Sequence, residues 1–554
     1  MSMPARFITC VRPKAIEDNS EIRRPYRMRK MATQPETTTI ELTPKEAQLK
    51  KLLLDAADYA NSSRSADEPV ILRWAGGWVR DRLLGIESHD IDTAINVMTG
   101  EAFASKICEL CEKPEIVEKH NIASDDIGNL HKIAKNPDKS KHLETTTIRL
   151  FGFDVDFVNL RKETYSEDSR NPQMEFGTAE EDALRRDATV NALFYNLNSG
   201  RVEDFTSGLR DMKAKLIRTP LEPFQTFMDD PLRVLRLVRF ASRLGFTIDP
   251  AAEQVMGNAK VLDALKLKIS RERVGVEVEK MLKGNDPRRS LQYIKDLGLY
   301  HTILTDPTIS DMPLPDISRW NSVYECLSHL FENRTPGSIS NVLIHVDEAP
   351  YYAWTLSALV PWENVSEPAH TRKGKQLLYF ITMAAREGIK APNKICDLVT
   401  AAHKNRTDIL ALKTAVIQKA TYINERDRFG MAIRQWDAKG GYWRLQVLFS
   451  LLVEAMQRWE VGDTSHAHNI DFLGEWQLFL DHLQELDVMG APSLKRIIDG
   501  TQLASALGVK PGRWMAEALD VCVAWQLRNP GVTDSAGAVE EVNSRRKELK
   551  IPST

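Results

Sequence analysis

LRWAGGWVRDRLLGIESHDIDTAI, residues 72–95, is the stretch of sequence that decides the fold. The apolar run at 70–74 predicts a short strand, Gly76-Gly77 a tight turn and WVRDRLLG a helix, after which HDIDTAI predicts a second strand. A glycine turn between a strand and a helix lets backbone N–H groups approach a phosphate and sets the positive helix end against its charge. Arg80, one turn into the helix, can add a charge-assisted contact.

Asp90 and Asp92 are two residues apart in the second predicted strand, so their side chains point to the same face. Neighbouring carboxylates repel each other and are costly to desolvate unless a cation lies between them. Magnesium prefers hard oxygen ligands and shares them with substrate phosphates, and two such ions can activate a hydroxyl and stabilise leaving pyrophosphate. The spacing also fits an exposed acidic loop, but the glycine turn upstream favours a phosphoryl-transfer site.

A second acidic pair occurs in TTTIRLFGFDVDFVNL, residues 145–160, which predicts two further strands. Phe153, Val155 and Phe157 share one face there, and Asp154 and Asp156 share the other. We expect Asp156 to be a third carboxylate of the catalytic group. The alternative is a solvated strand face.

Basic and acidic residues adjoin in EDALRRDATVNALFYN, residues 181–196. Arg186 and Asp187, next to each other before an apolar stretch, can hold the ribose hydroxyls and phosphates of a nucleotide. They can equally form a buried structural ion pair.

FMDDPLRVLRLVRFASRLGF, residues 227–246, predicts one helix with Pro231 near its start and Asp229 and Asp230 in its first turn. Four arginines fall within roughly a third of the circumference of this helix, an arrangement that suits a triphosphate or an RNA backbone: Arg233, Arg236, Arg239 and Arg243. Asp230 and Arg233 are adjacent on the helix, and together they offer an acceptor and a donor that can read a base edge. The competing interpretation is an ordinary salt bridge on a charged helix face.

The chain of 554 residues is too long for a single hydrophobic core. Its pattern predicts an N-terminal α/β region followed by a helical region. An amphipathic helix is expected at 43–60 with Thr43 as its cap, residues 163–178 form a polar loop, and strand signals stop after about residue 220. The formal charge of −3 is no evidence for a nucleic-acid partner. Any basic surface that binds one must therefore be local and offset by acidic surface elsewhere. Six cysteines make no disulfide framework, and no apolar run is long enough to cross a membrane.

Taken together, these motifs resemble the class II tRNA nucleotidyltransferases, the CCA-adding enzymes and their bacterial poly(A) polymerase relatives. GGWVRDRLLG with DID is similar to motif A of that family, RRDATVNALFYN to motif B, EDFTSGLRDM (203–212) to motif C, DDPLRVLRLVRF to motif D and SRERVGVEVEKML (270–282) to motif E. LKRIIDGTQLASALGVKPGRW, at 494–514, resembles a tail element. Asp229 stands where bacterial members have Glu, and Ala188 replaces a larger residue of motif B; both features resemble the fungal branch.

The resemblance implies an α+β fold, in which a polymerase-β-like head sheet is followed by helical neck, body and tail. It places the head at 41–215, the neck at 216–300, the body at 301–430 and a tRNA-binding tail at 431–554, after a leader at 1–40. It implies that Asp90 and Asp92 bind two Mg²⁺ ions, that Gly76, Gly77 and Arg80 support the triphosphate, and that Arg186 and Asp187 select ribose. Asp230 and Arg233 then pair with CTP and later ATP, Arg236 and Arg239 belong to the same nucleotide site, and Arg170 lies in a flexible loop.

The activity so implied is untemplated addition of CCA to the tRNA 3′ end, in which the terminal hydroxyl attacks the nucleotide α-phosphate and pyrophosphate leaves. The partners are tRNA, CTP and ATP, with no membrane and no obligate protein partner. A poly(A) polymerase, a CC-only enzyme and an inactive tRNA-binding protein on the same scaffold are the alternatives. The basic, acid-poor start of the chain fits a mitochondrial leader or a disordered tail of chance composition. The resemblance to the fungal branch favours the leader, and it implies that starts at Met1, Met28 or Met31 also supply cytoplasm and nucleus.

Overall fold

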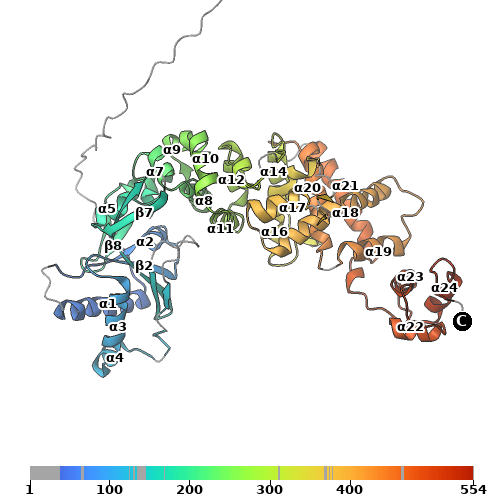
Figure 1. Ribbon diagram of the computed structural model, residues 1–554, viewed down its shortest axis with the longest axis horizontal. Helices are drawn as coiled ribbons and strands as arrows, with labels where there is room; N and C mark the ends of the chain where they lie inside the picture. The colour runs from blue at the N-terminus through green and yellow to red at the C-terminus, as the bar shows by residue number, and fades with distance from the viewer. Residues whose placement is uncertain are drawn as a thin grey trace, which may run out of the picture.

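The computed structural model describes residues 38–63, 68–123, 125–128, 131–133, 145–166, 169–309, 312–366, 371–372, 375–376, 378–438, 440–462 and 467–552. Most of the expected leader, with Met1, Met28 and Met31, lies outside these residues. The described part is α+β, as predicted, with a sheet near the N-terminus and helices strung out along the long axis after it (Figure 1).

A seven-stranded mixed sheet forms the front of the molecule, in the order β3-β4-β5-β2-β1-β8-β9. Its strands are β1 (Leu72–Ala75), β2 (Asp90–Ile95), β3 (His131–Ile133), β4 (Thr145–Leu150), β5 (Phe153–Asn159), β8 (Leu193–Asn196) and β9 (Arg201–Asp204). Only β2 and β5 pair in parallel; the other neighbours are antiparallel. The strands expected at 70–74, in HDIDTAI and in 145–160 are therefore confirmed.

The two faces of the sheet differ in what covers them. Trp74, Ile91, Val155 and Phe157 are buried in the main apolar core, in which helices α1 and α3 also take part. A smaller cluster lies on the opposite face, where Ala75 and Ala94 meet Ala179 and Ala183 of α5. Since strand side chains alternate, Asp90, Asp92, Asp154 and Asp156 fall on this second face.

Helices α1 (Pro44–Ser62), α2 (Gly77–Leu83), α3 (Gly100–Cys111), α4 (Pro114–His120), α5 (Ala179–Leu184) and α6 (Gly208–Lys213) accompany the sheet, with a 3-10 turn at Thr189–Asn191. Thr43 caps α1 as predicted, because its hydroxyl accepts from Glu46 N while Glu46 accepts from Thr43 N.

The stretch expected as one helix at 227–246 is two helices, so that prediction is wrong. Helix α7 (Pro223–Asp229) ends before Asp230, and α8 (Leu232–Leu244) begins after Pro231. Asp230 has the extended conformation (φ −135°, ψ 96°), which the following proline favours. Asp229 and Asp230 therefore lie at the end of α7 and not in the first turn of the arginine-bearing helix.

Residues 163–178, expected as a loop, lie mostly in a two-stranded hairpin of β6 (Arg161–Ser166) and β7 (Ser169–Phe176), which is separate from the main sheet. Two-residue strands also occur after residue 220, contrary to expectation. One is β11 (Thr247–Ile248), paired with β10 (Leu216–Ile217), and two more are β12 (Thr371–Arg372) and β13 (Lys375–Gln376). They are too short to leave a pattern in the sequence.

The rest of the described chain is helical: α9 (Pro250–Met256), α10 (Ala259–Lys268), α11 (Arg271–Leu282), α12 (Pro287–Asp296), α13 (Tyr300–Ile303), α14 (Trp320–Glu332), α15 (Ile339–Leu343), α16 (Ala349–Leu359), α17 (Phe380–Met383), α18 (Asn393–Ile417), α19 (Arg426–Trp436), α20 (Trp443–Arg458), α21 (Ala467–Glu485), α22 (Gly500–Ala506), α23 (Met515–Arg528) and α24 (Ala536–Ser544). Short 3-10 segments at Val360–Asn364 and Ala491–Ser493 and a π-helical turn at Ala384–Gly388 complete it. Among the described residues, no helix is both long and apolar enough to cross a membrane.

Candidate active site

The acidic face of the sheet brings together two pairs of carboxylates that are far apart in the sequence. In the parallel pairing of β2 and β5, Asp90 lies opposite Asp154 and Asp92 opposite Asp156. On the other side of β2, Asp92 is paired with Ala75, the residue just before the glycine turn. Asp156 also accepts a hydrogen bond from Thr147 of β4. The sheet thus places Asp156 beside the predicted metal ligands, and its role as a third carboxylate stays a prediction.

The carboxyl group of Asp92 has a raised pKa. Desolvation is the main reason that the pKa of its carboxyl is raised; Arg186 opposes the shift, and Asp156 and Asp90 reinforce it. The carboxylate is open to solvent, yet protein surrounds it closely enough to disfavour its charge. Within the described part of the chain, no three Asp, Glu, His or Cys side chains gather as a complete metal site. A divalent ion here would need oxygen ligands from a bound substrate as well.

The Gly76–Gly77 turn has the shape that the sequence predicts. Gly76 precedes α2 with φ 66° and ψ −121°, a conformation that essentially only glycine adopts. A Cβ at Gly76 would come within 2.8 Å of Arg186 Nη1 and 3.9 Å of Asp92 Oδ2. The turn, Arg186 and Asp92 therefore converge on one point at the start of α2, where Gly76 N donates to the carbonyl of Leu193 at 3.1 Å.

Arg80 lies beneath this turn rather than facing solvent. Its side chain is buried, with Nε 2.7 Å from Asp81 Oδ1 and Nη1 donating to Asn191 Oδ1. Burial lowers the pKa of its guanidinium, against the influence of Asp81. Arg80 is thus held between Asp81 and Asn191 with little exposure to solvent, and its predicted contact with a triphosphate stays a prediction.

Asp187, which is itself buried, forms an ion pair with the partly exposed Arg236 of α8. Its Oδ2 lies 2.6 Å from Arg236 Nε, and its Oδ1 accepts from Asn191 Nδ2 at 3.1 Å. Burial by itself would raise the pKa of Asp187, but Arg236 and the Asn191 hydrogen bond hold it far below its usual range. The ion pair expected for Asp187 is therefore present, with Arg236 as the partner, and a contact of Asp187 with ribose stays a prediction.

The candidate base-reading residues sit at the break between α7 and α8. Arg233 donates from Nη1 to the carbonyl of Thr226 at 3.4 Å and from Nη2 to that of Arg185 at 2.7 Å. Asp230 Oδ2 lies 3.4 Å from Arg273 Nη2 of α11. The two residues remain one turn apart, with Arg233 N donating to Asp230 O at 3.0 Å. Their base-reading role stays a prediction.

Further along α8, Arg239 pairs with Glu277 of α11 at 2.6 Å and Arg243 with Asp81 of α2 at 3.2 Å. The arginine face is therefore partly neutralised by acids of other elements, which the sequence of α8 could not reveal. Arg170 lies in β7, and its side chain is outside the described residues.

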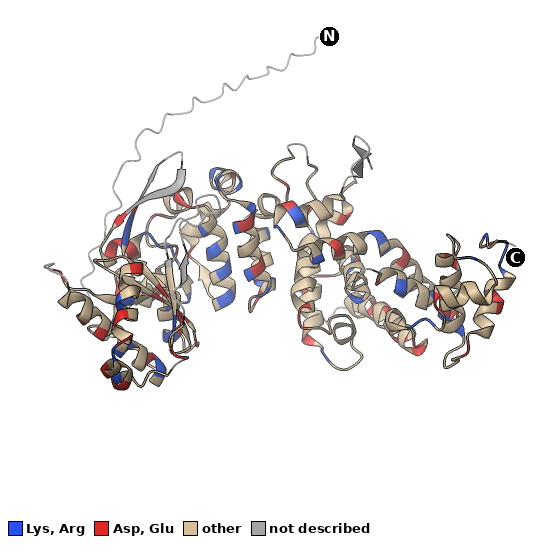
Figure 2. Cartoon of the chain, turned by 60° about the horizontal axis from the view of Figure 1, so that its bottom comes forward, with Lys and Arg blue, Asp and Glu red and all other residues tan. Residues whose placement is uncertain are grey.

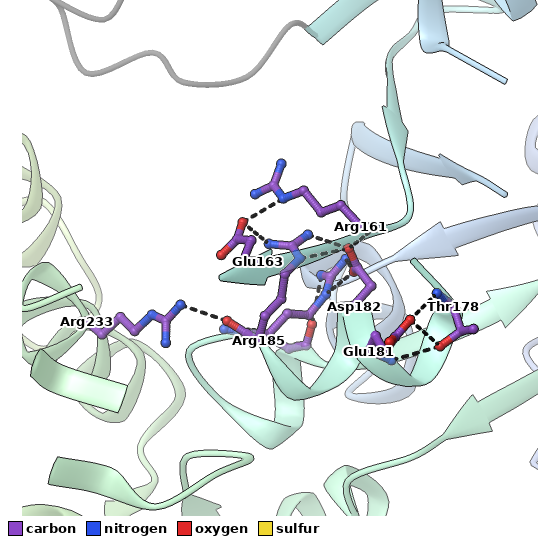
Figure 3. Close-up of polar contacts among 9 residues, drawn as sticks. Arg161, Glu163, Thr178, Glu181, Asp182, Arg185 and Arg233 are labelled. Carbon is purple, nitrogen blue, oxygen red and sulfur yellow. Dashed lines mark hydrogen bonds and ion pairs between the residues drawn. The ribbon is translucent and has the colours of Figure 1, made fainter. Parts of the chain in front are cut away.

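Sequence reasoning missed Asp182 and Glu163. Asp182 of α5 binds both Arg185 and Arg186, and Glu163 of β6 binds Arg185 (Figure 3). The spacing of Asp182 three and four residues before the arginines is a signal that could have identified it.

Comparison with known proteins places this site in a family. A model of the poly A polymerase head domain matches residues 72–218, and a model of the probable RNA and SrmB-binding site of polymerase A matches residues 245–312. The nucleotidyltransferase lcsQ of Purpureocillium lilacinum is 54% identical, over 93% of this chain and 93% of its own. The mitochondrial CCA tRNA nucleotidyltransferase of Saccharomyces cerevisiae is 39% identical, over 89% of this chain and 92% of its own.

The chain belongs to the CCA tRNA nucleotidyltransferases. The resemblance that the sequence motifs indicate is confirmed, and with it the assignment as an enzyme of this family. The solved structure of the Thermotoga maritima CCA-adding enzyme complexed with tRNA matches with a TM-score of 0.56 at 21% identity, over 91% of this chain and 96% of that chain. At that identity the match supports the fold alone. The fold is a polymerase-β-like head followed by helices. For this CCA tRNA nucleotidyltransferase, the individual residue roles and the divisions at 215, 300 and 430 stay predictions.

Proposed function

We propose that this chain adds C, C and A to the 3′ end of tRNA from CTP and ATP without a nucleic-acid template. The tRNA 3′-hydroxyl oxygen forms a bond to the nucleotide α-phosphorus and loses its proton to water. The bond from the α-phosphorus to the bridging oxygen of the β-phosphate breaks, and pyrophosphate leaves with the negative charge. The observation that carries the proposal is the convergence of Asp92, Arg186 and the Gly76 turn, which puts carboxylates beside a cradle for phosphates.

The carboxylate face fits divalent cations, and we assign Asp90 and Asp92 as their ligands, with Mg²⁺ as the ion. The raised pKa of Asp92, which desolvation and the neighbouring Asp156 and Asp90 cause, reflects negative charge that a cation would stabilise. Mg²⁺ commonly takes one or two carboxylates and completes its shell with phosphate oxygens and water. When bound, two such ions supply activation of the attacking hydroxyl and stabilisation of the leaving oxygen.

The chain's own groups hold the nucleotide around these ligands. The Gly76 N–H is donated to the carbonyl of Leu193 at 3.1 Å, so the N–H of Gly77 is the backbone donor of the turn for the triphosphate, and Arg186 contributes positive charge beside it. Asp187, ionised by its pairing with Arg236, accepts from ribose hydroxyls. Asp230 and Arg233 offer an acceptor and a donor at the break between α7 and α8, as an amino-acid template for cytosine and then adenine.

Two hollows with basic side chains lie along α8 and α11 and support RNA as the partner. Arg239, Arg243, Lys280 and Lys283 line a hollow between α8 and α11. It is continuous through Lys283 and Asn285 with a cavity of about 800 Å³, whose basic lining residues are Arg288, Arg334 and Lys394. Acids and bases are mixed over the molecule (Figure 2), and the larger cavity is lined by both, since Glu279, Asp286, Asp347 and Glu348 accompany its basic residues. The hollow between α8 and α11 is the basic part, with four basic side chains and Glu279 as its acid, and it supports contact with a phosphate backbone.

The experiment is extension of three tRNAs, ending before CCA, after CC and after CCA, with CTP and ATP separately and together. We expect two residues with CTP alone on the first, one residue with ATP on the second and none on the third. A stop after CC would indicate a CC-only enzyme, several adenosines a poly(A) polymerase, and no extension an inactive tRNA-binding protein.

The relative from Saccharomyces cerevisiae is named as mitochondrial, and with the basic start of the chain this supports a mitochondrial location here. Supply of cytoplasm and nucleus from Met28 or Met31 is proposed on the positions of those methionines alone.

A further inference from the structure

The last three helices, α22 to α24, form a C-terminal unit with a hydrophobic core of its own. The buried side chains of this core extend from Ile498 to Ile551, whereas those of the main core end at Val488. Figure 1 shows the unit at the end of the long axis opposite the sheet. The 3-10 turn at Ala491–Ser493 is the only regular structure in residues 486–499, which connect α21 to α22. Contacts across this connection therefore decide how firmly the unit is held.

Helix α19 packs against both parts of the chain. One face contributes Phe429, Ile433 and Trp436 to the main core, as their helical spacing allows. The other face lies against α23 of the C-terminal unit, where a Cβ at Gly430 would come within 2.8 Å of Leu527 Cδ1. A small apolar cluster fills this contact, made of Met431, Ala491, Leu494, Val523 and Leu527. The absence of a side chain at Gly430 thus lets the two helices approach closely.

Arg426, at the start of α19, joins the ends of two other helices. Its Nε donates to the carbonyl of Leu486 at 2.7 Å and its Nη2 to that of Asp487 at 2.8 Å, just beyond the end of α21. Its Nη1 donates to the carbonyl of Leu527 at 3.0 Å, in the last turn of α23. Carbonyls at helix C-termini lack partners within the helix and carry partial negative charge, so a planar guanidinium suits them. One side chain therefore ties α19 and α21 to the C-terminal unit.

Polar contacts at both ends of α19 complete the joint. Asp427 pairs with Arg528 at the end of α23, and Arg528 Nη2 lies 2.5 Å from Glu541 Oε2 of α24. Burial lowers the pKa of the Arg528 guanidinium, but its hydrogen bonds to Glu541 and Asp427 bring that pKa above its ordinary value. At the other end of α19, Arg434 Nη1 donates to the carbonyl of Leu494 at 3.1 Å and so holds the connecting segment. The C-terminal unit is thus fixed at several points along one helix.

We propose that Arg426 and Gly430 are positioning residues that lock the C-terminal unit in one place relative to the acidic face of the sheet. The unit then meets the part of a tRNA remote from its 3′ end while that end lies at the carboxylates. The inference rests on the proposed function, because it takes tRNA as the molecule that spans both ends of the protein. A unit already held in its bound position costs less entropy to order when tRNA binds. The lock therefore acts on the affinity for tRNA and leaves the chemical step alone.

The functional test compares Arg426→Ala and Gly430→Leu with wild type on a tRNA that lacks CCA. Each change should raise the KM for tRNA, and the Kd for tRNA in a gel shift without nucleotide, by about tenfold. At saturating tRNA, kcat and the KM for CTP should stay within twofold of wild type, because the nucleotide site is untouched. A KM for tRNA within twofold of wild type, or a fall in kcat without a change in that KM, would overturn the proposal.

Gly490→Ala is the matched control, because Gly490 lies in the connecting segment with φ −88° and its Cβ would meet nothing within 4 Å. This variant should keep the wild-type KM for tRNA; a tenfold rise would assign the effect to the segment and refute a role of the joint. A hairpin that carries the acceptor stem alone is the matched substrate, since it lacks the outer part of tRNA. Its KM should be the same in all four proteins, and a rise equal to that for tRNA would contradict the lock.

Hydrogen exchange of the full-length protein without tRNA tests the joint independently of activity. Arg426→Ala and Gly430→Leu should speed amide exchange at 488–494 and 524–528 by about tenfold, while 515–522 in the core of the C-terminal unit keeps its wild-type rates. Unchanged exchange at the joint, or equal speeding at 515–522, would contradict a lock between two folded parts. A wild-type chain that binds tRNA more tightly than both variants but extends none would contradict the proposed function alone and support the lock.

Discussion

Asp92 lies directly opposite Asp156 in the parallel pairing of β2 and β5. Strands remote in sequence thereby present acids on one face of the sheet, beside the glycine turn at Gly76 and the guanidinium of Arg186. This relationship explains why an unfavourable accumulation of charge is built into an otherwise well-packed head. It also makes the carboxylates the first residues to test.

Asp90→Ala and Asp92→Ala should each abolish nucleotide incorporation, by about a thousandfold or more, because each removes a ligand of the assigned ions. Circular dichroism should show an unchanged fold, since both side chains are exposed. Asp154→Ala is the control, as it removes the carboxylate opposite Asp90 on the same face. A double variant at Asp90 and Asp92 with full activity would refute the metal assignment.

Gly76→Ala should reduce nucleotide affinity by about tenfold or more and lower stability by roughly 1–3 kcal/mol, since its backbone conformation is strained for alanine. The added methyl would also press on Arg186 Nη1 at 2.8 Å. Gly85→Ala is the matched control, because Gly85 too has a positive φ, 73°, but its Cβ would meet nothing within 4 Å. Equal loss of CTP binding in both variants, measured by titration calorimetry, would argue against a phosphate cradle at Gly76.

Arg233→Ala should loosen the choice between CTP and ATP by about tenfold while leaving the triphosphate contacts in place. The measurement is misincorporation on tRNA ending in C and in CC. Arg243→Ala changes the same helix ten residues on, where the guanidinium faces Asp81, and should keep wild-type selectivity. Unchanged selectivity in Arg233→Ala would remove it from the base-reading pair.

Asp187→Asn should destabilise the protein by about 1–2 kcal/mol at pH 7, less than a fully buried pair, because the Arg236 side chain is 37% exposed. Burial by itself would raise the pKa of Asp187 in the folded protein, but its pairing with Arg236 brings that pKa well below the unfolded value. Its stabilisation is thus present above the unfolded value near 4 and is lost as the pH falls through the folded value. Urea unfolding should show the gap between variant and wild type narrowing below about pH 4; a constant gap would mean that charge is not the cause.

Much of the fold could be predicted from local patterns. The capped helix after Thr43, the strand–turn–helix at 72–83 and the two strands around Gly152 all follow from hydrophobic alternation, caps and glycines. Such signals depend only on neighbouring residues. The stretch around Pro231 is the exception, because the pattern predicts one helix and the proline holds Asp230 in an extended conformation that separates two.

The tertiary partners of the site could not be predicted. Nothing in α8 indicates that Arg236 would meet Asp187 or that Arg239 would meet Glu277, since those acids come from elements 38 to 49 residues away. The parallel register that sets Asp92 against Asp156 likewise depends on how β2 and β5 are ordered in the sheet. Sequence spacing predicts which acidic and basic side chains are candidates for the site, and the fold determines which of them lie side by side.

The most direct test of the account is the 3′-terminal sequence of tRNA after incubation with the wild-type chain, CTP, ATP and Mg²⁺, beside an identical reaction with Asp92→Asn. The account predicts that a tRNA lacking its end gains CCA and then stops, and that the Asp92→Asn reaction leaves it unextended. Extension by Asp92→Asn at the wild-type rate, or a wild-type product ending in anything other than CCA, would contradict it.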